Sequence, residues 1–277
     1  MSNVNCRLAW NSILDTKTLT ATSFDGNMTV SNLQDCQLQT SWRSLNTQPQ
    51  EITCDFGGRE FVSYLCVYKH NLSYAATIRF VLSNNADYSN PVVDITFKAV
   101  RPTYGRGQLR GLHRGGYVNK QVLTPYSVKW ISPVFARYFK VIIDDQTNPQ
   151  GYIQISRLKV GRHFEGKYNV NWGASRGLKS NSVVAISDSG ARFVSRKSQQ
   201  RTLTIDLSYL IANEEFNIFE MQQEIDLDKD VLISVYPEQQ TTEENLYCLL
   251  GFFESWRDST RPNVAHRVWG ATFMEGL

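Results

Sequence analysis

The chain lacks the sequence features that would direct it to a membrane, to export or to nucleic acid. No run approaches the roughly 20 consecutive apolar residues that a membrane helix needs. The first ten residues show no basic start followed by an apolar core, so we expect no secretory signal and a protein made in a cytoplasm. The net charge is only +3. A nucleic-acid binder would carry a stronger basic footprint, so we do not expect nucleic acid as a partner.

Signatures of metal sites and disulfide frameworks are also missing. The five cysteines form no Cys-x-x-Cys pair, so we expect free and mostly buried thiols. The four histidines share no metal-like spacing, and His-Glu-x-x-His is absent. These histidines are His70, His113, His163 and His266. We therefore predict no metal site and no cofactor.

Aromatic residues, by contrast, are abundant, with 14 Phe, 13 Tyr and 6 Trp. Flat rings pack well on a pleated surface, which favours strands. Ile52, Cys54 and Phe56 alternate with polar residues, and the same period of two recurs over 78–82 and 139–143. That alternation is typical of half-buried antiparallel strands. Residues 1–163 are therefore predicted to form one β-sandwich domain.

From residue 164 onward the pattern predicts a smaller β-rich α+β domain, ending at residue 277. Alternation over 203–207 indicates a strand, after which Ser208 is expected to cap a helix that runs to about Glu224. Ala212, Phe216 and Phe219 would share one face of that helix. Three further strands are expected over 231–235, 246–253 and 268–273.

A Gly- and Arg-rich segment at about 98–120 interrupts the sandwich pattern. It is expected to be a loop that is mobile or ordered by a partner. Its cations suit an acidic protein face, a phosphate-bearing glycan or nucleic acid, and a solvated loop is the equal alternative. The candidate contact residues in it are Arg101, Tyr104, Arg106, Arg110, His113 and Arg114.

One catalytic motif occurs, but without its structural context. Residues 173–177 match Gly-x-Ser-x-Gly. A nucleophile elbow needs a buried apolar strand before the serine and a helix after it, and polar residues stand on both sides here. A polar turn explains the motif better than an esterase that uses Ser175. We therefore predict that the protein is not an enzyme.

Three segments of the first region follow one domain pattern in order and spacing. Residues 35–42 are similar to Asp-Gly-x-x-x-Thr-x-Trp, residues 52–57 to Ile-x-Val-Asp-Leu-Gly, and residues 136–140 to Ala-Arg-Tyr-Val-Arg. Together they resemble the discoidin or coagulation-factor C-type domain over about residues 10–162. Cys36 stands where that family has Gly, and no terminal cysteine pair is evident.

The resemblance implies an antiparallel, galactose-binding-like jelly roll whose loops at one end contact sugar. His70, Asn71 and Trp42 would lie at that end, although a turn explains His70 and Asn71 equally well. The same pattern places Trp42 and Tyr138 in the core. Asp35 corresponds to a loop that holds a cation in related domains, and a turn-capping carboxylate is the simpler account.

The second region has a different resemblance. Residues 190–206, followed by a short helix and aromatic strands, are similar to tail-tip and baseplate proteins of tailed bacteriophages. This implies a structural virion component, assembled in the host cytoplasm, that docks other tail proteins as a homo-oligomeric ring or hub and contacts the host surface. The alternative is a carbohydrate-binding module that recognises cell-surface glycans.

Overall fold

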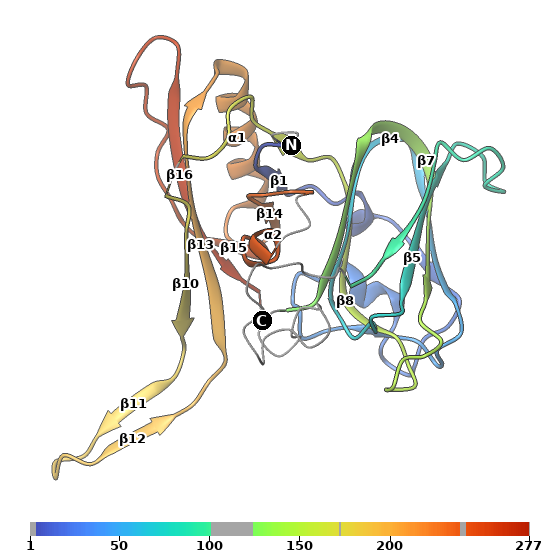
Figure 1. The fold of residues 1–277 in the computed structure, drawn as a ribbon, viewed down its shortest axis with the longest axis horizontal. Coiled ribbons are helices and arrows are strands. Elements are labelled where there is room, and N and C mark those ends of the chain that lie inside the picture. The colour runs from blue at the N-terminus through green and yellow to red at the C-terminus, as the bar shows by residue number, and fades with distance from the viewer. Residues whose placement is uncertain (1–3, 101–123, 172, 239–241, 277) are drawn as a thin grey trace. The chain divides into compact units, whose positions relative to one another are not determined.

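The computed structural model describes residues 4–100, 124–171, 173–238 and 242–276 (Figure 1). The chain splits into two compact units. Residues 11–163 and 238–246 form one, here called the sandwich unit. Residues 1–10, 164–237 and 247–277 form the other, here called the mixed unit. The fold is mainly β with antiparallel sheets, a β-sandwich and a small α+β part, which confirms the predicted fold class.

The sandwich unit is built from antiparallel strands and short helical turns. Its strands are β2 (Leu19–Ala21), β3 (Trp42–Arg43), β4 (Gln50–His70), β5 (Thr77–Ser83), β6 (Val93–Lys98), β7 (Tyr126–Asp144) and β8 (Gln154–Gly161). Its helical segments are η1 (Ile13–Thr16), η2 (Val30–Gln34) and α2 (Thr242–Leu246). The sheet order is β3-β8-β4-β7-β5-β6, and β2 pairs with β4.

Two long strands, β4 and β7, run together through both layers of the sandwich. Their first and last halves have different neighbours: residues 52–54 of β4 pair with β2, whereas residues 64–70 pair with β8. Between these halves the register shifts at Asp55/Glu60, and Gly57 takes a φ of +78° that favours glycine. The ribbon therefore bends there, as the arch of β4 and β7 in Figure 1 shows.

The alternation read from the sequence is confirmed in this unit. Ile52, Cys54 and Phe56 are buried in β4, and the even-numbered residues of 78–82 and odd-numbered residues of 139–143 are buried in β5 and β7. Trp42 is fully buried in the same core and donates a hydrogen bond from Nε1 to the Ser23 carbonyl at 2.9 Å. The core thus lies between the two layers.

The mixed unit contains a seven-stranded antiparallel sheet in the order β10-β13-β16-β15-β14-β1-β9. These strands are β1 (Arg7–Ala9), β9 (Phe164–Glu165), β10 (Ser175–Ser180), β13 (Gln199–Leu210), β14 (Val231–Ser234), β15 (Cys248–Trp256) and β16 (Arg267–Glu275). The first strand of the chain lies between β14 and β9. The unit therefore includes residues from both ends of the described chain.

Helix α1 (Ala212–Ile225) begins later than the sequence indicated. Ser208 does not cap it, because pairing with β16 carries β13 on to Leu210. The Glu214 carboxylate instead accepts a hydrogen bond from the Ile211 backbone N–H at 2.9 Å. Ile218, Met221 and Ile225 are buried on the sheet side of the helix. No helix among the described residues is long and apolar enough to cross a membrane.

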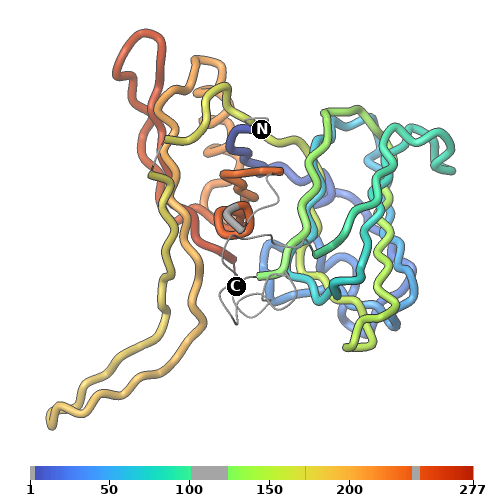
Figure 2. Tube along the Cα trace, viewed as in Figure 1, coloured from blue at the N-terminus to red at the C-terminus, as the bar shows by residue number. Residues whose placement is uncertain are grey.

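A two-stranded ribbon extends from this unit and is here called the arm (residues 181–198). It contains β11 (Val183–Ile186) and β12 (Arg192–Ser195), which pair only with each other. The arm continues the β10–β13 pair beyond Ser180 and Gln199 and leaves the main sheet (Figure 2). Its tip is closed by a hydrogen bond from Gly190 N–H to the Ser187 carbonyl, with Gly190 at a φ of +82°.

Candidate ligand-binding groove

An open groove of about 560 Å³ lies on the sandwich unit, next to the bend of β4 and β7. Its floor is the outward face of two strands, where Thr53 and Asp55 of β4 stand beside Tyr138 of β7. Residues 16–20 form one wall. The turn between β5 and β6, which includes Tyr88, forms the other. The groove thus joins three segments that are distant in sequence.

Two tyrosine rings are held in fixed positions at this groove. Lys140 Nζ lies 4.2 Å from the centroid of the Tyr88 ring, and Arg137 Cζ lies 5.1 Å from that of Tyr138. The two rings meet edge to face with centroids 6.4 Å apart. Tyr88 donates its hydroxyl hydrogen to the Phe139 carbonyl at 2.9 Å. Cation–π contacts and this hydrogen bond keep both rings at the groove in the absence of a ligand.

Burial makes the Tyr88 phenol a weaker acid. Desolvation raises the pKa of its phenol to about 12, and nearby Cys54, Glu51, Asp55 and Tyr138 act in the same direction. The hydroxyl therefore stays neutral near pH 7 and remains a hydrogen-bond donor. The backbone φ of Tyr88 is +57°, a conformation that is costly for a tyrosine. The surrounding contacts must therefore hold the backbone there.

The carboxylate of the groove is fully engaged. Asp55 accepts two hydrogen bonds from Arg137, at 2.9 and 3.0 Å, and a third from the Gly57 backbone N–H at 2.8 Å. The Arg137 hydrogen bonds and then the Gly57 bond hold the pKa of Asp55 below its usual value. Asp55 thus remains an anion near neutral pH and orients Arg137 toward Tyr138.

Several polar groups of the groove are, in contrast, unused. The hydroxyls of Thr16, Thr18, Thr20 and Thr53 make no hydrogen bond to another described residue. Within the described ranges, Lys17 has no ion-pair partner inside 4.0 Å. Thr20 and Thr53 stand opposite each other on paired strands, so their hydroxyls form one polar row. Water occupies such groups in solution, and a polar ligand can replace it.

His70 lies at the other end of β4 and is buried. Its Nδ1 accepts a hydrogen bond from the Leu72 backbone N–H at 3.3 Å, and its Nε2 donates to Ser127 Oγ at 2.9 Å. Ser127 in turn donates to the Ala99 carbonyl at 2.5 Å. This relay fixes the tautomer with hydrogen on Nε2. It also connects the two strand ends from which the Gly/Arg-rich segment departs.

Asn71, next to it, ties two loops together. Its side chain donates to Gln150 Oε1 and the Tyr152 carbonyl, and accepts from the Gln154 backbone N–H. Each polar atom of the side chain therefore has a partner. The expected role of His70 and Asn71 in ligand contact stays a prediction. In the structure, the side chains of both residues form hydrogen bonds within the sandwich unit.

The remaining candidates from the sequence fall into two groups. Those on the Gly/Arg-rich segment lie outside the described residues: Arg101, Tyr104, Arg106, Arg110, His113 and Arg114. Asp35 caps a turn, because its carboxylate accepts hydrogen bonds from Gln37 N–H and the Thr40 hydroxyl. Ser175 is the exposed first residue of β10, and no hydrogen bond joins it to a histidine in the described part of the chain.

The two large aromatics assigned to the core have different positions. Trp42 is in the core, as its place in the domain pattern implied. Tyr138 is only half-buried and lines the groove, so its assignment to the core is corrected. Lys17 and Tyr88 were not among the candidates, since neither stands in a local pattern that marks a binding residue.

Comparison with known proteins adds structural similarities. No family model matches the chain, and no curated protein matches it either. The lectin domain of lectinolysin complexed with Lewis B antigen aligns with 55% of this chain and 96% of that chain, at 16% identity and a TM-score of 0.39. A chitosan-binding module of a chitosanase/glucanase from Paenibacillus sp. IK-5 aligns with 55% and 99%, at 18% identity and a TM-score of 0.38.

A Streptococcus pneumoniae fucose binding module aligns with 55% of this chain and 96% of that chain, at 15% identity and a TM-score of 0.38. These structures are thus carbohydrate-binding modules or lectin domains. With TM-scores below 0.5, the similarities assign this chain neither a family nor a ligand.

Proposed function

We propose that the sandwich unit binds carbohydrate in the groove that contains Thr20, Thr53 and Tyr138. One observation carries the proposal: unused hydroxyls and held aromatic rings line the same open groove. A sugar ring has an apolar face of C–H groups and a rim of hydroxyls. Aromatic side chains stack on such a face, while a few polar groups fix its orientation. The groove offers both kinds of contact.

Binding without hydrolysis is the activity that fits these residues. Glycoside hydrolysis ordinarily uses two carboxyl groups on opposite sides of the scissile bond. Asp55 is the only carboxylate among the described residues that line the groove, and Arg137 holds it as a paired anion. The proposal is therefore a non-enzymatic binding module. Chitosan, fucose and Lewis B antigen, named for the similar structures, belong to the same ligand class.

A glycan array probed with the full-length protein is the first test, followed by calorimetric titration with the glycan that binds best. Tyr138→Ala should weaken binding by roughly threefold to tenfold, because it removes the stacking ring. Thr20→Val and Thr53→Val keep the side-chain shape and remove a hydroxyl, and each should weaken binding by roughly two- to tenfold. Lys17→Met should affect acidic glycans more than neutral ones.

Phe135→Ala is the matched control, since this exposed ring lies on β7 outside the groove. It should leave the affinity unchanged. The proposal would be abandoned if no glycan bound above background, or if Tyr138→Ala and Phe135→Ala behaved alike.

The tail-tip role, the other tail proteins as partners and the virion as location stay predictions. They concern assembly rather than the groove. Sedimentation of the protein with purified tail components would test them, and failure to bind any of them would count against that role.

A further inference from the structure

The arm exposes more apolar surface than a soluble ribbon needs. Ile186 is 71% exposed and Phe193 62% exposed, and Val183, Val184 and Val194 are also exposed. In an antiparallel pair, opposite residues point to the same face. Val184 and Val194 therefore share one face with Ile186, whereas Val183 shares the other with Phe193. Both faces of the arm are apolar, and neither covers the other.

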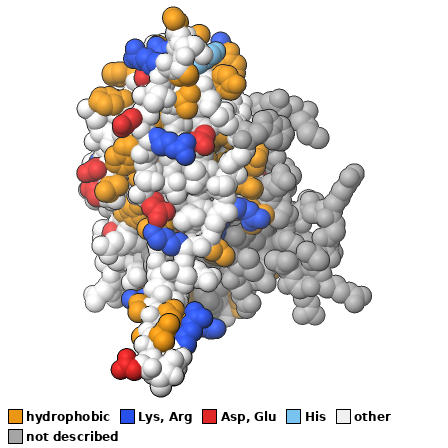
Figure 3. All heavy atoms as spheres, turned by 90° about the vertical axis from the view of Figure 1, so that its left-hand side faces the viewer, with side chains coloured by type: hydrophobic (Ala, Val, Ile, Leu, Met, Phe, Trp, Pro, Cys, Tyr) orange, Lys and Arg blue, Asp and Glu red, His pale blue; other side chains and the backbone are white. Residues whose placement is uncertain are grey.

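A two-stranded ribbon of this kind is marginal on its own in water. Within the described residues the arm has no third strand and no helix packed on it. Exposed apolar surface that is grouped in this way marks an interaction site. Figure 3 shows orange apolar side chains next to blue basic ones on the arm, at the bottom of the view.

The mixed unit also has an apolar groove. It has a volume of about 650 Å³ and lies between α1 and the β15–β16 hairpin. Trp256 and Trp269 line the hairpin side, and Phe216 and Phe219 line the helix side. The sequence placed both phenylalanines on one helix face with Ala212, and the structure shows that this face is the groove wall and not the buried one.

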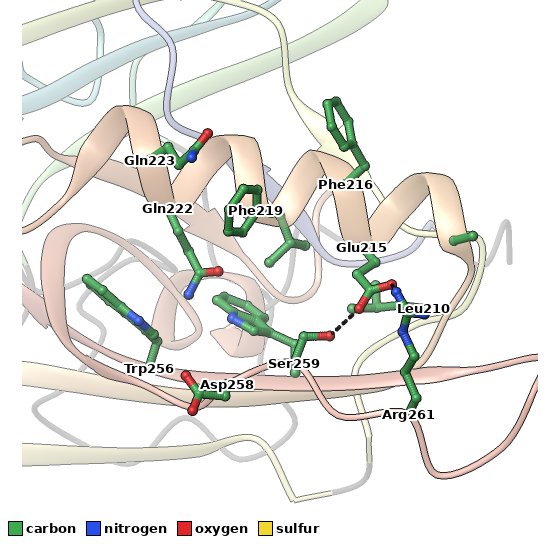
Figure 4. Close-up of a pocket in the computed structure, with 13 residues that line it drawn as sticks. Leu210, Glu215, Phe216, Phe219, Gln222, Gln223, Trp256, Asp258, Ser259 and Arg261 are labelled. Atoms are coloured by element: carbon green, nitrogen blue, oxygen red, sulfur yellow. Dashed lines mark hydrogen bonds and ion pairs between the residues drawn. The ribbon is translucent and has the colours of Figure 1, made fainter.

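Several polar side chains line this groove. Figure 4 shows Gln222 pointing from α1 toward Trp256 and Asp258, and Glu215 pointing toward Ser259 and Arg261. Trp269 is almost fully buried, and its Nε1 has no hydrogen-bond acceptor among the described residues. A buried donor without an acceptor is costly.

The arm is basic, and one carboxylate of the groove, that of Asp258, has no ion-pair partner among the described residues. The arm carries Arg192, Arg196 and Lys197 against one acidic residue, Asp188, and no ion pair involves these cations in the part of the chain that the structure describes. In the groove, Glu215 is paired with Arg261 at 3.1 Å and with Arg267 at 2.9 Å. Asp258 adds an exposed carboxylate at the groove. An apolar, basic arm therefore matches an apolar groove whose unpaired charge is the Asp258 carboxylate.

The arm cannot fill the groove of its own molecule. It begins at one end of β13, before Gln199, while the groove begins at the other end, at Leu210. The 12 residues of β13 span about 40 Å at the rise of a β-strand. The arm then continues away from the sheet (Figure 2). Only an arm from another molecule can reach the groove.

We propose that the arm of one copy docks into the α1 groove of a second copy of this chain. The contact joins two different surfaces, so it is head-to-tail and leaves one arm and one groove free at the ends of any open assembly. Such contacts close into a ring where the rotation permits and otherwise extend as a filament. The apolar arm residues supply the buried surface, and Asp258 offers one carboxylate to the cations of the arm.

Sedimentation analysis of the full-length protein tests this, over about 1 to about 100 µM, a range that covers micromolar affinities. The wild-type protein should sediment as species larger than a dimer at the upper end. Ile186→Asp/Phe193→Asp places charges on both arm faces, and Phe219→Asp places one in the groove. Each variant alone should be monomeric. Mixed together they should form a one-to-one dimer, because the first retains a groove and the second retains an arm.

Val264→Asp is the matched control, since Val264 is an exposed apolar residue of the mixed unit outside both surfaces. It should associate like the wild type. Ile186→Ser/Phe193→Ser and circular dichroism separate lost docking from lost folding. A monomeric wild type would overturn the proposal, as would an arm variant that still self-associates. A mixture of the two variants that stays monomeric would overturn the head-to-tail contact as well.

Discussion

In the sandwich unit, large aromatics such as Trp42, Phe80 and Phe139 are fully buried between two layers. In the mixed unit, Phe193, Phe216 and Phe219 face solvent instead. Twelve of the 18 exposed large apolar side chains among the described residues belong to the mixed unit. The difference fits our two proposals, a polar groove for a small ligand on the sandwich unit and surfaces for another protein chain on the mixed unit.

The interiors of the two units do not differ in this way. Burial raises the pKa of the Cys6 thiol in the mixed unit to about 12 and that of Cys54 in the sandwich unit to about 11. In both cases desolvation is the main cause. Burial therefore acts on a thiol in the same direction in both units, and the contrast lies at their surfaces.

The largest effect should come from the core of the sandwich unit. Trp42→Ala removes a fully buried ring and the hydrogen bond that its Nε1 donates to the Ser23 carbonyl. The free energy of unfolding of this unit should fall by about 3–5 kcal/mol. Chemical denaturation followed by circular dichroism measures it. A loss of unfolding free energy as small as that caused by Phe135→Ala, at an exposed residue, would contradict the burial of Trp42 in this core.

The ion pair of a buried arginine should have the next largest effect. Arg157 is fully buried and donates two hydrogen bonds of 2.7 Å to Asp15. Asp15→Ala removes both of these charge-assisted hydrogen bonds, and the free energy of unfolding should fall by about 1.5–3 kcal/mol. Asp94→Ala breaks the exposed Arg79–Asp94 pair and serves as the control, with an expected loss below about 1 kcal/mol. Equal losses would contradict the distinction between the two pairs.

Replacing exposed apolar residues of the mixed unit should hardly change its free energy of unfolding. Phe216→Ser and Phe193→Ser remove rings that are 66% and 62% exposed. The free energy of unfolding of the monomer should change by less than about 0.5 kcal/mol. Denaturation at a concentration that keeps the chain monomeric is the measurement. A loss near that of Trp42→Ala would mean that these rings belong to a core.

The smallest effect should be that of pH on the groove. The pKa of Asp55 is lowered by Arg137, so the stabilisation from its anion is present above the unfolded-state pKa and is lost only as pH falls through the lower folded value. Glycan affinity should therefore stay constant from about pH 8 to about pH 5, above the usual Asp pKa. Titration calorimetry across that range checks this, with Asp55→Asn as the comparison. A decline within the range would contradict the assignment of Asp55.

The sequence predicted the strands better than it predicted their partners. Period-two alternation identified residues 52–56, 78–82 and 139–143 because burial on one face is a local signal. The helix start was wrong at Ser208, since pairing of β13 with β16 overrides a local capping preference. Nothing in the local pattern indicates that residues 7–9 pair with β14, far along the chain.

The groove was not predictable for the same reason. Its polar row exists because β2 pairs with β4 and sets Thr20 opposite Thr53. Tyr88 reaches the groove through a turn whose positive φ has no sequence signature in a tyrosine. The arm, in contrast, has a readable signal: two short apolar runs flank Ser-Asp-Ser-Gly at 187–190, which is typical of a hairpin.

The central claim is that ligand binding and self-association belong to separate surfaces of one chain. Measuring both properties on the same two variants tests it most directly. Tyr138→Ala should bind glycan roughly threefold to tenfold more weakly in calorimetry and sediment like the wild type, whereas Ile186→Asp/Phe193→Asp should bind glycan normally and sediment as a monomer. The claim would be contradicted if either variant changed both properties together, or if neither variant changed either one.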